Sequence, residues 1–199
     1  MYTIEIHNCN IISLDPTIFH HISQLQNISL TDNKFKNIDE LLFQHIPNLQ
    51  TINISHNDIT VIHPETFQNI PKLQKINISN NNIHYLIDRT FQNIPLLEEI
   101  NIGGNRNLNM LFPDIFLNSP NIKKLNLRLL GLEDLYPEII QNLPLLESIE
   151  LDNNRLTYID PTTFLNSSNL QYITPFSLKN GTLKFQDFLF IYIIISLCK

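Results

Sequence analysis

The sequence predicts a strand-rich and turn-rich array of short repeats. Three observations lead to this prediction. A unit of about 24 residues returns along most of the 199-residue chain. Each unit opens with alternating aliphatic and polar residues, which is typical of a short, half-buried strand. The chain has no alanine, the best helix former, but 27 asparagines and 32 isoleucines, so a helical bundle is disfavoured.

The repeat is clearest in its opening strand. LQNISLTDNKF at 25–35 returns as LQTINISHNDI at 49–59 and as LQKINISNNNI at 73–83. Seven full turns follow this pattern, and a partial one comes after them. The turns start near residues 1, 25, 49, 73, 97, 122 and 146, and the partial turn starts at 170. Such a unit cannot bury its apolar side alone, so its neighbours must stack on it. We therefore expect one array over 1–174 and a non-repeat apolar tail over 175–199.

Within each turn, three columns of residues carry the prediction. Positions four and six are aliphatic, as in Ile52 and Ile54, and should face the core. Position nine is asparagine in five turns, where its amide can bond backbone groups as the chain leaves the strand and can form a ladder. Cys9 occupies this column in the first turn, where we expect a buried structural thiol, and Leu130 interrupts the column in the sixth turn. Near position 19 the chain places Phe19, Phe43, Phe67, Phe91, Phe116 and Phe164, with Ile140 as the exception.

These columns resemble the leucine-rich repeat pattern LxxLxLxxN/CxL over residues 1–174. The segment IHPETFQNIPK at 62–72 is similar to the typical 24-residue subfamily found in Toll-like receptors, Slit and chaoptin. The resemblance implies an α/β fold, a right-handed solenoid with a parallel sheet on the concave face and a mostly irregular or 3-10 convex side. It also implies a non-enzymatic module that binds a protein on that face, in an extracellular or cell-surface setting such as adhesion, development or innate immunity.

Positions two, three, five, seven and eight are expected on or beside the concave face. They are mostly amides and hydroxyls in turns two to four but carry charges of both signs in turns five to seven. Because neighbouring strands lie about 4.8 Å apart, these charges can pair with one another or form a platform for a ligand. Gly103, Gly104 and one extra residue in turn five break the pattern, through either a functional hot spot or the decay of one repeat. The candidate binding residues are Glu99, Asn101, Lys123, Lys124, Asn126, Arg128, Leu129, Glu150 and Asp152.

Glycosylation is the one modification that the sequence indicates. The N-x-S/T acceptor pattern occurs at Asn27, Asn53, Asn77, Asn166 and Asn180. The first three fall in predicted strands and face the concave side. Glycans there would cover turns two to four and leave turns five to seven to a protein ligand.

Catalysis, metals, cofactors and nucleic acid find no support in the sequence. The chain has no phosphate-binding loop, nucleophile elbow or HExxH motif. His20, His21 and His45 lie in the outer loops without carboxylate partners and are expected to be solvated. The net charge of −6 disfavours a surface for nucleic-acid phosphates.

The two ends of the chain are compatible with either an extracellular or a cytoplasmic protein. MYTIEIHNCN is not a signal peptide, and the cysteine-rich caps usual in extracellular relatives are missing, so we expect a fragment of a longer protein. Membrane attachment would need a missing segment, because the apolar run in 185–199 is shorter than the roughly 17–25 residues that span a bilayer. Exposed end faces could also associate with a second copy. The alternative is a cytoplasmic scaffold or decoy protein of the same fold.

Overall fold

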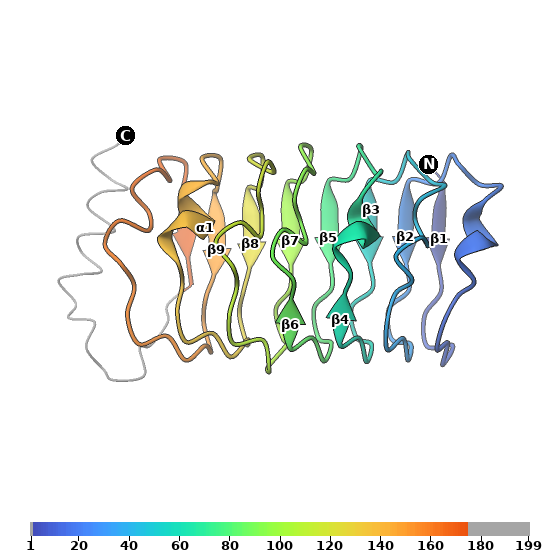
Figure 1. The fold of residues 1–199 in the computed structure, drawn as a ribbon, viewed down its shortest axis with the longest axis horizontal. Coiled ribbons are helices and arrows are strands. Elements are labelled where there is room, and N and C mark those ends of the chain that lie inside the picture. The colour runs from blue at the N-terminus through green and yellow to red at the C-terminus, as the bar shows by residue number, and fades with distance from the viewer. Residues whose placement is uncertain (1, 175–199) are drawn as a thin grey trace.

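The computed structural model describes residues 2–174, which form a solenoid with one strand of its main sheet in every turn (Figure 1). This sheet has eight parallel strands in the order β1-β2-β3-β5-β7-β8-β9-β10. Their bounds are β1 (Thr3–Glu5), β2 (Asn27–Ser29), β3 (Thr51–Asn53), β5 (Lys75–Asn77), β7 (Glu99–Asn101), β8 (Lys124–Asn126), β9 (Ser148–Glu150) and β10 (Tyr172–Ile173). Equivalent repeat positions pair, as Ile52 does with Ile76, so the repeat length sets the register. The predicted tail at 175–199, with the acceptor Asn180, lies outside the described residues.

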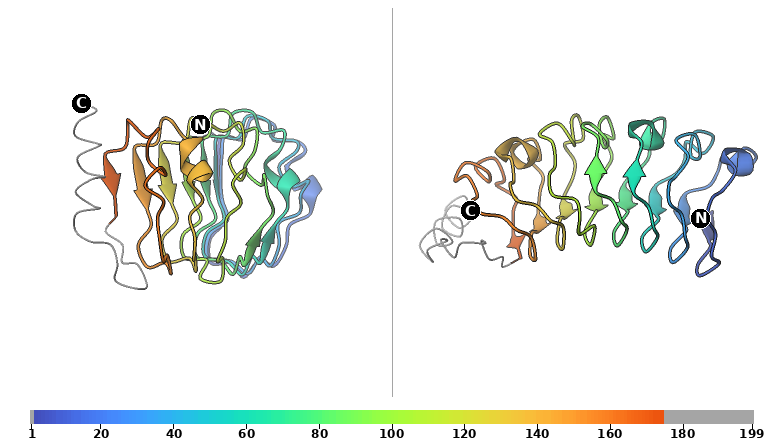
Figure 2. Two further views of the ribbon diagram at one scale, coloured as in Figure 1. Left: turned by 60° about the vertical axis from the view of Figure 1, so that its left-hand side comes forward. Right: turned by 60° about the horizontal axis from the view of Figure 1, so that its bottom comes forward.

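The solenoid bends into a shallow arch with its main sheet along the inner side (Figure 2, right). The outer side consists mostly of turns and loops. Its regular elements are the 3-10 helices η1 (Pro16–Phe19) and η2 (Pro64–Phe67), the helix α1 (Pro137–Gln141), and a small sheet of β4 (Val61–Ile62) and β6 (Tyr85–Leu86). Each of the three helices begins with a proline, whose fixed φ suits a first helical turn. The predicted parallel sheet on the concave face and the largely irregular convex side are confirmed.

Between residues 2 and 174, none of the helices has the length and apolar character that crossing a bilayer requires.

A continuous apolar core fills the space between the two sides. The aliphatic residues at positions four and six are buried in turns two to seven, with Ile52, Ile54 and Ile78 at 0% exposure, and are half-buried in turn one. The phenylalanine column is buried as predicted. Phe91 stacks between its neighbours, with ring centroids 5.6 Å from that of Phe67 and 5.8 Å from that of Phe116. The core is therefore shared between turns, as the repeat pattern requires.

The asparagine column forms the predicted ladder, which consists of Asn33, Asn57, Asn81, Asn105 and Asn154. Asn81 shows the pattern. Its Nδ2 donates to the carbonyl oxygens of Ile54 and Ile78, at 3.1 and 3.0 Å. Its Oδ1 accepts from the backbone N–H of Ile59, 3.1 Å away in the preceding turn. Each ladder asparagine thus satisfies buried backbone groups of its own turn and of the turn before it.

The gap in the ladder at Leu130 is compensated by the extra residue of turn five. In other turns, the ladder oxygen receives an N–H from a residue 22 positions earlier. The corresponding group for Leu130 is the N–H of Leu108. The longer loop lets this group donate to the carbonyl oxygen of Asn105 instead, at 3.0 Å. Leu130 is therefore free to bury its side chain, which is 4% exposed.

The expectation for Cys9 is wrong, because its side chain is exposed. The Sγ donates to the carbonyl oxygen of His7, at 3.1 Å. The buried ladder residues Asn33, Asn57, Asn81 and Asn105 each lie between two turns, whereas the described residues contain no turn before that of Cys9. Its backbone still joins the ladder, because its N–H donates to Oδ1 of Asn33 at 3.0 Å.

Candidate binding site on the concave face

A groove of about 370 Å³ runs across the inner face from β3 to β9. Its floor is the buried aliphatic row of position four. Its polar lining comes from positions three and five, whose side chains alternate with that row along each strand. The polar residues that line it are Thr51, Asn53, Lys75, Asn77, Glu99, Asn101, Lys124, Asn126, Ser148 and Glu150.

A second row of asparagines fixes the ends of four strands, β3, β5, β7 and β8. In turns three to six, the Oδ1 of the position-five asparagine accepts from the backbone N–H two residues later. The bond is 3.2 Å from Ser55 to Asn53, 3.1 Å from Ser79 to Asn77 and 3.0 Å in the next two turns. These side chains form short turns with their own backbone, which orients their Nδ2 amides. Sequence interpretation missed this role, although the recurrence of asparagine at position five was its signal.

Opposite charges on neighbouring turns pair as expected. The distance between Nζ and the carboxylate oxygen is 3.1 Å for Lys123 with Glu98 and 3.0 Å for Lys124 with Glu99. Farther along, Nε of Arg128 lies 3.5 Å from a carboxylate oxygen of Asp152. Such exposed pairs contribute about 0–1 kcal/mol each, so they order the surface more than they stabilise the fold.

Glu99 has a second partner that the sequence prediction did not include. Nζ of Lys75, in the preceding turn, lies 3.1 Å from the other oxygen of the Glu99 carboxylate. The sequence does contain a signal for this second pair, because position three alternates in charge: it is lysine, glutamate and lysine in turns four to six. Partial burial raises the pKa of Glu99, but hydrogen bonds from Lys124 and Lys75 outweigh it and hold that pKa below its usual value. The carboxylate is therefore a fixed negative charge, unsuited to exchanging protons near neutral pH.

The groove brings together five of the nine predicted binding residues: Glu99, Asn101, Lys124, Asn126 and Glu150. Asn126 and Glu150 also contact each other, with Nδ2 donating to Oε2 at 2.9 Å. The remaining four, Lys123, Arg128, Leu129 and Asp152, flank the lining just before or after the strands. One expectation about this face is wrong in turns two to four. Position seven is buried there, at Thr31, Ser55 and Ser79, because the chain is already turning towards the ladder.

The predicted glycosylation acceptors occupy two kinds of place. Asn27, Asn53 and Asn77 lie in β2, β3 and β5, and the last two line the groove. Asn53 and Asn77 also face each other directly in the pairing of β3 with β5. Asn166 is exposed in the outer loop of turn seven.

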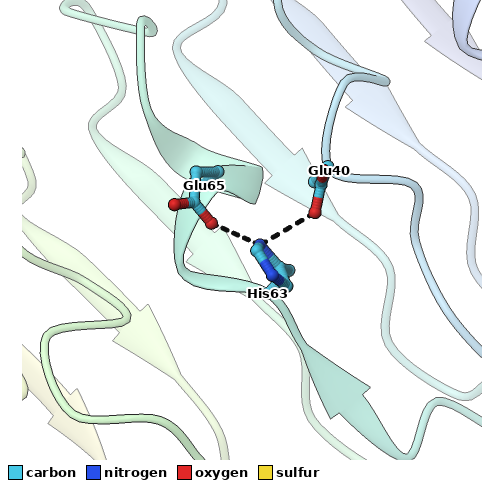
Figure 3. A group of neighbouring side chains, drawn as sticks. All are labelled: Glu40, His63 and Glu65. Atoms are coloured by element: carbon cyan, nitrogen blue, oxygen red, sulfur yellow. Dashed lines mark ion pairs between the residues drawn. The ribbon is translucent and has the colours of Figure 1, made fainter.

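The histidines considered as metal ligands lie on the convex side. His20, His21 and His45 are exposed, as expected, and the rings of His20 and His45 meet edge to face with centroids 4.0 Å apart. The group best placed to hold a metal is a different one, Glu40, His63 and Glu65 (Figure 3). Position in the repeat gives no sign of it, because the three residues belong to different columns.

The repeat array matches a known family along its length. The Leucine rich repeat profile matches residues 1–59, 47–106, 96–156 and 120–174. No curated protein matches the chain by sequence.

Solved structures show the same fold. One is that of the Toll–Spatzle complex, described as a molecular hub in Drosophila development and innate immunity, with a TM-score of 0.77 and 25% identity over 85% of this chain. Another is the TLR13–ssRNA13 complex, with a TM-score of 0.82 and 22% identity over 88% of this chain. The chain spans 23% and 25% of those two proteins. Human 5T4 (Wnt-activated inhibitory factor 1, trophoblast glycoprotein) has a TM-score of 0.71 and 21% identity, with 91% of this chain and 71% of 5T4 covered.

Proposed function

Because this chain belongs to the leucine-rich repeat family, we propose that it is a non-enzymatic module that binds a protein partner in its concave groove. The observation that carries the proposal is the groove itself, an open surface shared by five consecutive turns and lined by amides and by charges of both signs. Such a lining can complement the mixed polar surface of another protein.

The rigidity of this face favours recognition. The asparagine ladder and the position-five asparagines tie both the backbone and the groove side chains to their neighbours. A surface that is already ordered loses little conformational entropy when a partner binds. Binding energy can then come from a few well-placed contacts around the centre, where Glu99 lies between Lys75 and Lys124.

The likeness to Toll supports a protein partner and an extracellular or cell-surface setting in development or innate immunity. The Toll structure contains the protein Spatzle, whereas the TLR13 structure contains RNA. We favour a protein because the groove has few unpaired positive charges. Lys75, Lys123, Lys124 and Arg128 each lie near a carboxylate, and the chain carries a net charge of −6.

Glycosylation at Asn53 or Asn77 fits this setting and would divide the groove. A glycan on either residue would occupy the part over β3 and β5. The part over β7 to β9 would remain open to the partner, and it holds most of the candidate binding residues.

The test is a charge reversal with a matched control. The chain is screened against a panel of secreted proteins and receptor ectodomains, and every binder is measured again with the triple variant Lys123→Glu, Lys124→Glu and Arg128→Glu. The control triple variant, Lys34→Glu, Lys36→Glu and Arg155→Glu, makes the same change in charge at exposed residues outside the groove lining.

We expect the groove variant to weaken binding at least about tenfold, since buried interfacial charge pairs cost roughly 2–5 kcal/mol to break, and the control to leave it unchanged. Both variants should remain folded, and the groove variant should lose only the small stability of its exposed ion pairs, about 0–1 kcal/mol each. Binders that respond equally to the two variants, or to neither, would contradict a concave binding site.

A further inference from the structure

Three side chains with metal-binding groups meet on the convex side, away from the groove. They are Glu40, His63 and Glu65, and one donor atom of each lies within 4.8 Å of the others. Nδ1 of His63 faces both carboxylates, 2.9 Å from Oε2 of Glu40 and in contact with Oε2 of Glu65 (Figure 3). Among residues 2–174, no other three histidine, cysteine or carboxylate side chains come together in this way.

The fold holds these residues through two neighbouring turns. His63 and Glu65 flank Pro64 at the start of η2, where the proline ring and a hydrogen bond from the N–H of Thr66 to the carbonyl oxygen of His63 fix the backbone. Glu40 belongs to turn two and reaches the pair because the turns stack. The His63 side chain makes no capping bond to η2, so its imidazole is committed only to the two carboxylates.

The donor set suits a divalent transition metal. An imidazole nitrogen and carboxylate oxygens are both ligand types that Zn²⁺ accepts, with bonds of about 2.0–2.2 Å. At present a single nitrogen position lies between two negative groups. A divalent cation between these three atoms would accept the lone pair of Nδ1 and one oxygen of each Glu, and its charge would balance both carboxylates. The side chains are about half exposed, so they can make the small shifts this requires and leave further coordination positions to water.

We propose that Glu40, His63 and Glu65 form a Zn²⁺-type site that ties turn two to turn three. The grouping is specific to these turns. One repeat later, the positions of His63 and Glu65 hold Ile87 and Arg89, which cannot form the same site. The sequence predicts no metal, because it gives no sign that Glu40 lies beside the other two residues.

The experiment is a calorimetric titration of the full chain with Zn²⁺, paired with thermal unfolding with and without the metal. Three variants are compared with the parent: His63→Gln, Glu40→Gln, and the control double variant His20→Gln and His45→Gln. The control removes the other histidine pair, the most evident competitor for the metal.

We expect one Zn²⁺ per chain and a rise in unfolding temperature that depends on the metal concentration. His63→Gln and Glu40→Gln should each weaken binding at least about tenfold and abolish that rise, whereas the control should change neither. The Glu40 variant is decisive, because only this residue reaches the site from the other turn. Zn²⁺ binding that is absent below millimolar concentration, that survives both substitutions, or that disappears in the control would overturn the proposal.

Discussion

Replacing Asn81 with alanine tests the ladder where it is most enclosed. The side chain is 6% exposed, so water has little access to the groups it serves. Removing this side chain leaves one of those backbone groups without a hydrogen-bond partner. The N–H of Ile59 has Oδ1 of Asn81 as its partner, and Ile59 is fully buried. The carbonyl oxygens keep other donors, because Ile54 still accepts from Asn57 and Ile78 from Asn105.

The magnitude follows from these contacts. One stranded buried N–H costs about 1–3 kcal/mol, and the two amide protons of Asn81 give up net bonds worth about 1 kcal/mol each. We therefore expect Asn81→Ala to lower the free energy of unfolding by about 4 kcal/mol. Asn154→Ala is the matched control. It removes the same kind of side chain at a half-buried place, where water can replace some of the lost hydrogen bonds. The free energy of unfolding should therefore fall by only about 1–2 kcal/mol.

The assay is urea unfolding of the full chain followed by circular dichroism, with the denaturant slope checked for each variant. Hydrogen exchange adds a local measurement, since the amide of Ile59 should exchange much faster in Asn81→Ala. A loss below about 1 kcal/mol, with the Ile59 amide still protected, would refute the assignment of the ladder as the partner of buried backbone groups.

Three further predictions concern the apolar core, the backbone at Gly104 and the effect of pH on stability. Phe91→Ala should cost about 3–5 kcal/mol in urea unfolding, because it opens a cavity between two stacked rings; a cost below 1 kcal/mol would contradict the shared core. Gly104→Ala should cost more than Gly131→Ala, because Gly104 has a φ of +79° and a Cβ there would lie 2.2 Å from Oδ1 of Asn80, whereas Gly131 has no such φ. Equal losses in thermal unfolding would refute this reasoning. The pKa of Glu99 is lower in the folded chain than its ordinary 4.5, so its contribution to stability is present above that pH and is lost as the pH falls through the folded value. The difference in stability between the parent and Glu99→Gln should accordingly shrink between pH 7 and pH 3, and a constant difference would argue against the paired carboxylate.

The elements that the sequence predicts well are those that recur in columns. Strand positions such as Ile52 and Ile76 are visible because alternation marks the buried side and the repeat length brings equivalent residues into register. Lys75 shows the limit of this reasoning. Its pairing with Glu99 lay within the column but was overlooked, because turn four otherwise carries amides and hydroxyls on this face.

Contacts between different columns could not be predicted in the same way. Glu40 meets His63 because the irregular outer segments of turns two and three pack at a particular offset. Nothing in the alternation of residues encodes that offset, which depends on the loop conformation of each turn. The error at Cys9 has a related cause. A column describes a residue as it sits between two turns, and Cys9 has only one neighbour in this chain.

The asparagine ladder has a direction, and this matters for how the chain is made. Oδ1 of each ladder residue reaches backward to an N–H 22 positions earlier, so a turn is completed by the one that follows it. During synthesis on the ribosome, the backbone N–H of Ile59 therefore has no ladder partner until Asn81 has emerged. We expect the nascent array to mature one turn behind its growing end, with the most recent turn always open to water or to a chaperone.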